Sequence, residues 1–175
     1  MEDSFDLSAL YLDIRSRAAK GERALAKLSP EILGKLKNLV GIPSSRLQAL
    51  FVLAHATHPV RDLEATLLAL PLAELSSEEA IWLLNCYRKH IIQGRFKDGD
   101  RLAHEFLELL RQWIYHRDPQ VQEWVLRTID ECGGQGIVFR RDVAKIKPGL
   151  WRSFRAHNRT LIELATYLER KWGAP

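Results

Sequence analysis

The stretch from Asp118 to Gly133 constrains the fold more than any other part of the sequence, because it marks both ends of a helix. Asp118 is a residue type that accepts hydrogen bonds from the first free backbone N–H groups, and Pro119 fits the first turn, where its missing N–H costs nothing. Gly133 is suited to the left-handed conformation that closes a helix. The apolar residues between these ends recur at helical spacing and form one face: Val121, Trp124, Val125, Ile129 and Cys132.

The rest of the sequence repeats this helical signal, and no segment sustains the period-2 alternation of a β-strand. Ser76 and Glu79 have the spacing of a capping box before another apolar run, which we expect to continue as one helix to Gly94. Ser44, Ser76 and Asp118 open similar helices at offsets of 32 and 42 residues. These offsets bracket a period of about 40 residues, which is typical of stacked helix pairs.

The Asp118 helix resembles the second helix of a HEAT repeat, for which the common pattern is Asp-Pro-x-Val-Arg followed by small and apolar residues and a closing Gly. The positions that match are Asp118, Pro119, Val121, Leu126 and Gly133. Gln122 departs from the usual Arg, and Trp124 stands where a small residue is common. The resemblance covers about one repeat well and residues 44–133 loosely. It implies a surface that binds protein or nucleic acid, and it transfers no catalytic residue.

These observations predict an all-α fold: a right-handed, α-solenoid-like stack of about three antiparallel helix pairs with helical caps. We expect a single domain over residues 1–175. Residues 1–28 would form the N-terminal cap, 29–133 the HEAT-like pairs and 134–175 a basic C-terminal cap. A final helix over 159–171 is predicted, with Tyr167 and Trp172 helping to seal the stack.

Composition favours a cytoplasmic protein without a membrane anchor. The longest stretch free of Asp, Glu, Lys and Arg runs over residues 47–60, which is too short and too polar to span a bilayer. The N-terminus is acidic, unlike that of a secretory signal. Cys86 and Cys132 are far apart and lie on apolar helix faces, as expected of buried free thiols in a reducing compartment.

Positive charge is concentrated at the end of the chain. Residues 134–175 contain nine basic and three acidic residues, whereas residues 1–133 contain 17 basic and 19 acidic residues. A concentrated positive field attracts polyanions where a dispersed one does not. In the basic part, cations alternate with aromatic residues, and the candidate binding residues there are Arg140, Arg141, Lys145, Lys147, Trp151, Arg152, Arg155 and Arg159.

Two interpretations of this basic segment remain open. Arg152, Arg155 and Arg159 would share one helix face and pair with phosphates or with an acidic protein, while Trp151 would stack on bases. Alternatively, the aromatic residues are buried and the arginines form an ordinary solvated face. Arg88 and Arg127 are further candidates, if the second helices line a concave face. Trp124 is either an oversized core residue or an exposed binding anchor.

Catalytic and metal-binding motifs are weak. His55 and His58 lack a nearby third ligand, so no metal site or cofactor is predicted. Gly133-Gly134-Gln135 is similar to the tripeptide of peptide-release factors, but it follows a helix end, where Gly-Gly is a stop signal. The HEAT-like alkylpurine DNA glycosylases resemble the chain in basic charge and Trp content, yet their base-recognition elements have no counterpart here.

The sequence therefore favours a non-enzymatic helical scaffold that binds a protein partner. A nucleic-acid-binding module that uses residues 139–159 is the alternative, and a repeat-fold enzyme comes third. The oligomeric state is left open.

Overall fold

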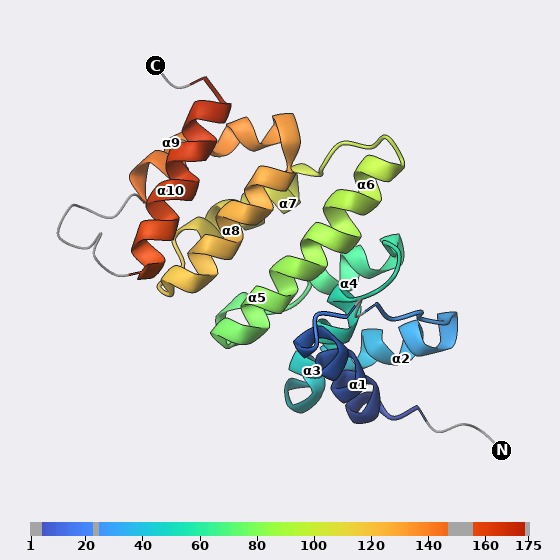
Figure 1. Cartoon of the computed structure of the whole chain (residues 1–175). Helices are drawn as coiled ribbons and strands as arrows, with labels where there is room; N and C mark the ends of the chain where they lie inside the picture. The colour runs from blue at the N-terminus through green and yellow to red at the C-terminus, as the bar shows by residue number, and fades with distance from the viewer. Residues whose placement is uncertain (1–4, 23–24, 147–155, 174–175) are drawn as a thin grey trace. The chain divides into compact units, whose positions relative to one another are not determined.

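The computed structural model of the chain describes residues 5–22, 25–146 and 156–173 (Figure 1). Over these ranges the chain is helical, with no strand and a single isolated bridge, so the prediction of an all-α fold is confirmed. The chain forms two compact units, residues 1–94 (unit 1) and residues 95–175 (unit 2). The expectation of a single domain stays a prediction. No helix in the described part of the chain has both the length and the apolar character to cross a bilayer.

Unit 1 is organised around one central helix. Its α-helices are α1 (Leu7–Ala19), α2 (Pro30–Val40), α3 (Pro43–Ala54), α4 (Glu64–Leu68) and α5 (Ser77–Cys86), and 3-10 turns cover Arg61–Leu63 and Leu72–Glu74. Helix α3 packs against α1, α2 and α5. Residues 49–53 are consecutive and apolar, so this part of the helix is apolar on every side. All five are buried, as expected of a helix at the centre of a unit.

Two helix starts in unit 1, at Ser29 and Ser76, have side-chain caps, whereas the predicted start at Ser44 does not, because α3 begins at Pro43 after Ile42. The Ser29 hydroxyl accepts a hydrogen bond from the Ile32 N–H at 3.3 Å. Ser76 and Glu79 form the complete capping box, in which the Glu79 carboxylate accepts from the Ser76 N–H at 2.8 Å. Such caps satisfy backbone donors that a helix start leaves free, each with about 1 kcal/mol of stability.

The helix that begins at Ser77 does not continue to Gly94 as a regular α-helix. Residues Tyr87–Ile92 form a π-helical turn, and helix α6 (Gln93–Lys97) follows it. The His90 ring is buried in this turn. Its Nδ1 accepts a hydrogen bond from the Val60 N–H at 3.0 Å, and its Nε2 lies 2.9 Å from the Leu53 carbonyl oxygen. One ring nitrogen therefore accepts while the other donates, which is the hydrogen-bond pattern of a neutral imidazole.

Unit 2 contains α7 (His104–Ile114), α8 (Pro119–Glu131), the 3-10 segment η4 (Gly133–Phe139), α9 (Arg140–Lys145) and α10 (Ala156–Lys171). Helix α8 packs against both α7 and α10, and α9 packs against α7, η4 and α10 (Figure 1). The Lys171 amine donates to the Asp130 carboxylate at 2.6 Å and so ties the end of α10 to α8.

Helix α8 has both predicted ends. The Asp118 carboxylate accepts a hydrogen bond from the Gln120 N–H at 2.8 Å, and Pro119 occupies the first turn. Gly133 has a φ of +59°, the left-handed conformation expected after a helix end. The predicted apolar face is buried except for Trp124, which is half-buried.

The C-terminal helix differs from the prediction in two respects. It begins at Ala156 instead of Arg159. Tyr167 does not help to seal the unit, because its side chain is 49% exposed and the Lys171 amine lies 6.0 Å from the centre of its ring. Leu161, Ala165 and Leu168 bury the opposite side of α10. Tyr167 is therefore on the solvent side of a helix whose apolar stripe is already complete.

Both cysteines are free and buried, Cys86 in unit 1 and Cys132 in unit 2. Burial raises the pKa of the Cys86 thiol strongly and that of Cys132 to about 12. Both thiols are therefore packing groups of the core rather than nucleophiles.

Candidate binding pocket of unit 2

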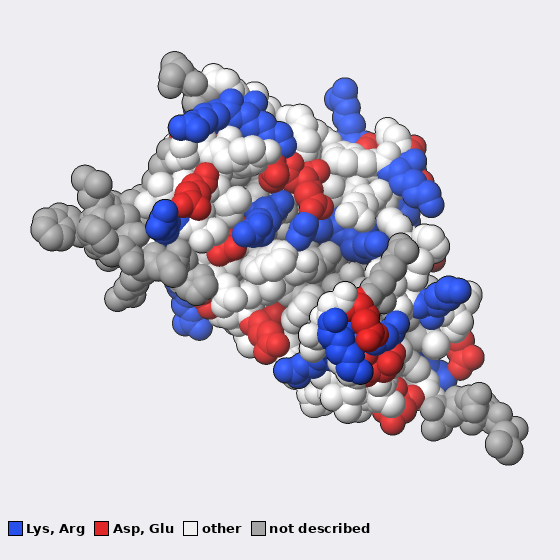
Figure 2. All heavy atoms as spheres, viewed as in Figure 1, with Lys and Arg blue, Asp and Glu red and all other residues white. Residues whose placement is uncertain are grey.

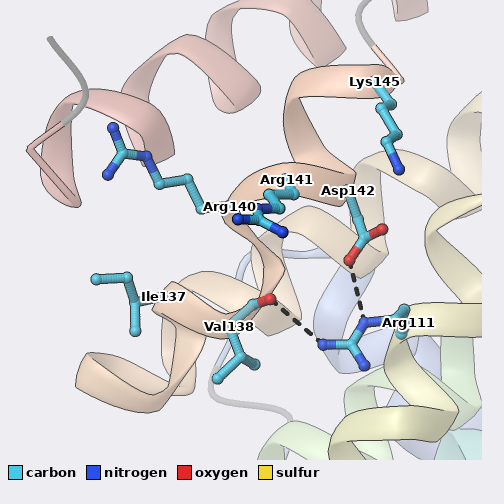
Figure 3. A pocket seen from close by; sticks show the side chains of 7 residues that line it. All are labelled: Arg111, Ile137, Val138, Arg140, Arg141, Asp142 and Lys145. Atoms are coloured by element: carbon cyan, nitrogen blue, oxygen red, sulfur yellow. Dashed lines mark hydrogen bonds and ion pairs between the residues drawn. The ribbon is translucent and has the colours of Figure 1, made fainter.

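A pocket of about 510 Å³ lies beside α9 in unit 2 (Figure 3). Its lining comes from three elements, α7, η4 and α9: Arg111, Ile137, Val138, Arg140, Arg141, Asp142 and Lys145. Arg111, Arg140, Arg141 and Lys145 are cationic, and Asp142 is the one acidic residue of this lining. The lining therefore carries a net charge of +3 at neutral pH.

The local sequence explains why η4 and α9 are held firmly. Phe139 and Val143 are buried and anchor the two elements in the core of unit 2, where each large apolar side chain contributes about 2 kcal/mol. Gly136 allows a close approach, because a Cβ atom there would lie 2.9 Å from the Ile129 carbonyl oxygen and 3.4 Å from the Trp172 ring. The pocket is thus built on packed backbone.

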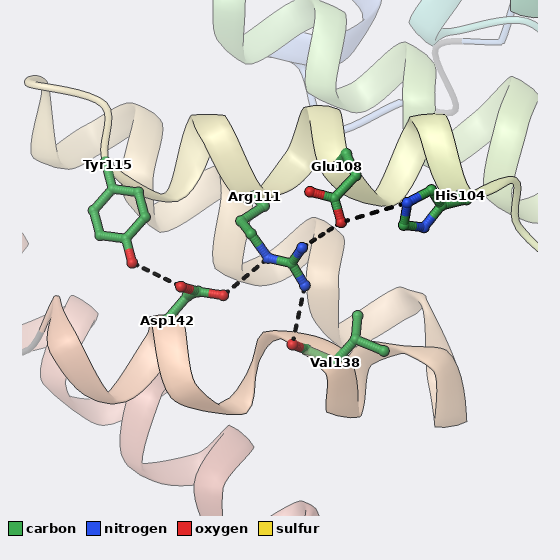
Figure 4. Close-up of polar contacts among 6 residues, drawn as sticks. All are labelled: His104, Glu108, Arg111, Tyr115, Val138 and Asp142. Atoms are coloured by element: carbon green, nitrogen blue, oxygen red, sulfur yellow. Dashed lines mark hydrogen bonds and ion pairs between the residues drawn. The ribbon is translucent and has the colours of Figure 1, made fainter.

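Arg111 joins α7 to the pocket wall, and all its hydrogen-bond partners belong to unit 2 (Figure 4). Its Nε donates to Asp142 Oδ2 at 3.0 Å, and its Nη2 donates to the Val138 carbonyl oxygen at 3.3 Å. A further bond goes to the Glu108 carboxylate, and the guanidinium lies 5.7 Å from the centre of the Phe139 ring. These bonds raise the pKa of Arg111, chiefly through Glu108. Arg111 is consequently a structural cation.

Asp142 is also fully engaged. Its second oxygen, Oδ1, accepts a hydrogen bond from the Tyr115 hydroxyl at 2.8 Å (Figure 4). This bond is the largest cause of the raised pKa of Tyr115, since ionisation of the phenol would remove the proton that it donates to the carboxylate. Both oxygens of Asp142 are therefore engaged by Arg111 and Tyr115, and neither bonds to Arg140, Arg141 or Lys145.

The remaining cations of the pocket have no partner in the described part of the chain. Arg140 is half-buried, while Arg141 and Lys145 are exposed. None of the three side chains has a hydrogen bond or an ion pair with any residue that the structure describes. Figure 2 shows basic and acidic side chains on the same face of the chain, and two other cations of unit 2, Arg127 and Lys171, form ion pairs with Glu123 and Asp130. The distinguishing feature of the pocket is thus the absence of compensation and not the density of positive charge alone.

An aliphatic rim accompanies these cations. Ile137 is 50% exposed and Val138 is 46% exposed, although both are large apolar residues on a well-packed segment. Single exposed apolar residues are common on protein surfaces. Two neighbours beside uncompensated cations offer a mixed apolar and cationic surface, which suits a ligand that is both anionic and apolar.

The predicted C-terminal residues are divided by the structure. Arg140, Arg141 and Lys145 are brought together at the pocket. Arg159 is exposed on α10, where its Nε donates to the Glu163 carboxylate at 3.1 Å. The other four candidates lie outside the described residues: Lys147, Trp151, Arg152 and Arg155. The predicted arginine row is therefore untested.

The candidates outside the C-terminal segment have local partners. The Arg127 guanidinium donates to Glu123 at 2.8 Å and lies 5.8 Å from the centre of the Trp124 ring. Trp124 is thus neither a fully buried core residue nor a fully exposed binding residue: it is half-buried, with the Arg127 guanidinium over its ring. In unit 1, Arg88 is half-buried and donates to the Asn85 side chain at 3.4 Å.

Sequence reasoning missed the neutral and structural parts of the pocket. Ile137 and Val138 gave no signal because a short apolar run normally predicts core. Arg111 and Asp142 are 31 residues apart, and no spacing rule connects them. The signal that was available, the excess of basic residues after residue 133, identified the cations but not their setting.

The weaker motifs have structural roles in the described chain. The Gln135 side-chain amide pairs with the backbone of Leu102, accepting from its N–H at 2.8 Å and donating to its carbonyl oxygen at 3.3 Å. His55 Nδ1 lies 2.8 Å from the Phe51 carbonyl oxygen. Among the described residues, no group of three or more His, Cys, Asp or Glu side chains is arranged to hold a metal ion.

The fold and the pocket thus define an all-helical chain with a cationic, aliphatic pocket. No family model matches the chain, and no curated protein or solved structure matches it significantly.

Proposed function

We propose that the chain is a non-enzymatic helical scaffold of the HEAT-like kind, and that it binds an acidic segment of a protein partner at the α9 pocket. One observation carries this proposal: Arg140, Arg141 and Lys145 line a pocket without forming an ion pair with any described residue, next to exposed Ile137 and Val138. Arg111 is paired with Glu108 and Asp142, whereas these three cations are available to bind a ligand.

The architecture part of the proposal rests on how neighbouring helices pack. Helices that are consecutive in the sequence contact each other, as α2 does α3 and α7 does α8. Within unit 1, α3 contacts α5, as expected if second helices stack on one another, and within unit 2, α8 contacts α10 of the predicted cap. We propose a solenoid-like stack on this basis, with buried free thiols that suit the cytosol.

A protein ligand suits this pocket better than bases do. Its apolar lining is aliphatic, whereas sequence-tolerant binding of single strands relies on aromatic side chains that stack on bases. An acidic peptide with aliphatic residues satisfies the cations and covers Ile137 and Val138 at the same time. Cations around a partly buried apolar contact also accelerate association and select against basic partners.

Nucleic acid is the second candidate, because the predicted arginine row at Arg152, Arg155 and Arg159 follows the three cations in the sequence. Phosphate contacts on duplex DNA predict that the logarithm of affinity falls with the logarithm of salt concentration by about one unit per phosphate neutralised. A peptide that buries aliphatic side chains predicts a shallower slope.

Fluorescence anisotropy separates the two candidates. Labelled peptides that combine Glu with Leu are titrated with the full chain, in parallel with duplex DNA and single-stranded RNA. We expect peptide binding to be lost in the double variant Arg140→Glu, Arg141→Glu. The matched control, Arg101→Glu with Arg117→Glu, changes the same charge at exposed arginines of unit 2 outside the pocket. Equal losses in both variants, or binding of nucleic acid alone, would refute the proposal.

A further inference from the structure

The charge balance of the pocket bears on which anion enters it. Arg111 pairs with the carboxylates of both Glu108 and Asp142, and the Tyr115 hydroxyl donates to the second oxygen of Asp142. An incoming anion therefore meets Arg140, Arg141 and Lys145 without competition from that carboxylate. Three cations exceed what one carboxylate neutralises, since Asp or Glu brings one negative charge and two oxygens.

A phosphate monoester matches this arrangement more closely. A phosphorylated side chain carries a charge of about −1.5 to −2 at pH 7 and three terminal oxygens that accept strong hydrogen bonds. Arginine binds such groups through parallel N–H donors, and lysine adds a point charge. Arg141 and Lys145 are four residues apart on α9 and so lie on one helix face, while the Arg140 side chain, which also lines the pocket, extends away from Lys145 (Figure 3).

The size and rim of the pocket indicate a ligand attached to a peptide. A volume of about 510 Å³ exceeds the need of a phosphoryl group alone. Ile137 and Val138 lie at the edge, where they would contact the residue next to the phosphorylated one. We propose that the α9 pocket recognises a phosphorylated side chain of a partner protein, flanked by an aliphatic residue. This inference rests on the proposed function and names the chemistry of its ligand.

A phosphodiester fits less well, although it offers the same kind of oxygen. Each diester carries one charge, and two of its four oxygens are esterified, so two remain for cations. A monoester ends its side chain and enters a pocket end-on, whereas a diester must pass through it. Nucleic acid is therefore an outcome of the test and not the expected ligand.

The test uses peptide pools with randomised flanks and a fixed central residue: phosphoserine, phosphotyrosine, serine, tyrosine or glutamate. Binding of the full chain is measured by anisotropy at constant ionic strength, with an unmodified oligonucleotide that lacks a terminal phosphate as a further probe. We expect a phosphorylated pool to bind at least tenfold more tightly than the glutamate pool and to enrich aliphatic residues next to the central position.

Two further measurements test whether the phosphate monoester itself is recognised. The phosphate of these residues loses its second charge near pH 6. The preference over glutamate should therefore shrink between pH 7.5 and pH 5.5. Arg141→Ala should lower the affinity for the phosphorylated pool at least fivefold, and Arg141→Lys should restore part of it. Arg101→Ala, an exposed arginine outside the pocket, serves as the control, and circular dichroism verifies that each variant is folded.

Each contrary result has its own meaning. Equal binding of phosphorylated and glutamate pools overturns this inference while the proposed function stands. Absence of binding to every pool overturns both. Binding of the oligonucleotide as tightly as the phosphorylated pools, with loss in the Arg141→Ala variant, overturns both in favour of nucleic acid.

Discussion

Units 1 and 2 both contain polar side chains that bind backbone, such as His90 and Gln135, but unit 2 also presents cations at a pocket. In unit 1, the buried polar groups bind backbone: Arg46 Nε donates to the Val40 carbonyl oxygen at 3.1 Å, and His90 bridges Leu53 and Val60. In unit 2, Arg140, Arg141 and Lys145 lie at a pocket with no described partner. A cation with partners inside the protein has a structural role, and a cation without them is a candidate for binding a ligand.

The same contrast recurs within the pocket. Arg111 and Arg141 are both arginines of its lining, yet Arg111 makes bonds to α7, η4 and α9 while Arg141 makes none to described residues. Removing Arg111 should damage the wall, and removing Arg141 should damage only recognition. Arg111 thus has a structural role, whereas Arg141 is available to a ligand.

The largest effect is expected for His90→Leu in unit 1. This change leaves the Val60 N–H and the Leu53 carbonyl oxygen without partners, at a cost of about 4 kcal/mol for the two buried groups. Urea unfolding followed by circular dichroism at pH 7.5 measures it. His104→Leu is the control, because the His104 side chain is 80% exposed. Similar losses in both variants would show that His90 has no special structural role.

Acidification should weaken unit 1 through the same ring. Burial lowers the pKa of His90 from 6.5 to about 4, so the folded chain keeps the ring neutral while the unfolded chain takes up a proton. Stability from this group is therefore complete above about pH 7 and falls as the pH drops from about 6.5 to 4, by at most about 3 kcal/mol. Unfolding free energies of the wild type and of His90→Leu, measured across this range, should converge. Parallel curves would contradict the assignment.

Gly136→Ala tests the packing that supports the pocket in unit 2. The added methyl group would lie 2.9 Å from the Ile129 carbonyl oxygen, which is backbone and unable to move aside freely. Overpacking of this kind costs about 2 kcal/mol. Gly134→Ala is a matched control, since a Cβ atom there meets nothing within 4 Å. Thermal unfolding of the two variants should separate them by several degrees.

The smallest difference is expected between Arg111→Ala and Arg141→Ala. Loss of Arg111 removes partly exposed hydrogen bonds to Asp142 and Val138 and should lower the free energy of unfolding by about 1 kcal/mol. Arg141→Ala should change it by less than about 0.5 kcal/mol, as for an ordinary surface position. Chemical denaturation measures both. A greater loss in Arg141→Ala would mean that this arginine has a structural partner.

The parts of the fold that sequence reasoning predicted were those encoded locally. The Asp118 cap, the Gly133 helix end and the Ser76–Glu79 box each depend on residues a few positions apart. The π-helical turn at residues 87–92 was missed, because its sequence has ordinary helical periodicity and the partners of the buried His90 within it are distant in the sequence. Those partners, Leu53 and Val60, are 37 and 30 residues away.

The site was predictable only in part for the same reason. Local composition pointed to Arg140, Arg141 and Lys145, while nothing local showed that Asp142 would bond to Arg111 of α7 and to Tyr115 directly after α7. Trp124 is a second example of a property that the sequence does not determine locally. Its size and spacing predicted a role, but whether Arg127 covers it depends on side-chain geometry.

The distribution of the thiols gives the chain an intrinsic reporter of local opening. Its two cysteines are divided between the units, Cys86 in unit 1 and Cys132 in unit 2. While a unit is closed, burial and a raised pKa keep its thiol unreactive; on opening, the thiol becomes accessible with a pKa near 8.5. Alkylation of Cys86 and Cys132, resolved by peptide mass spectrometry, therefore times the opening of each unit separately in the unmodified wild-type sequence.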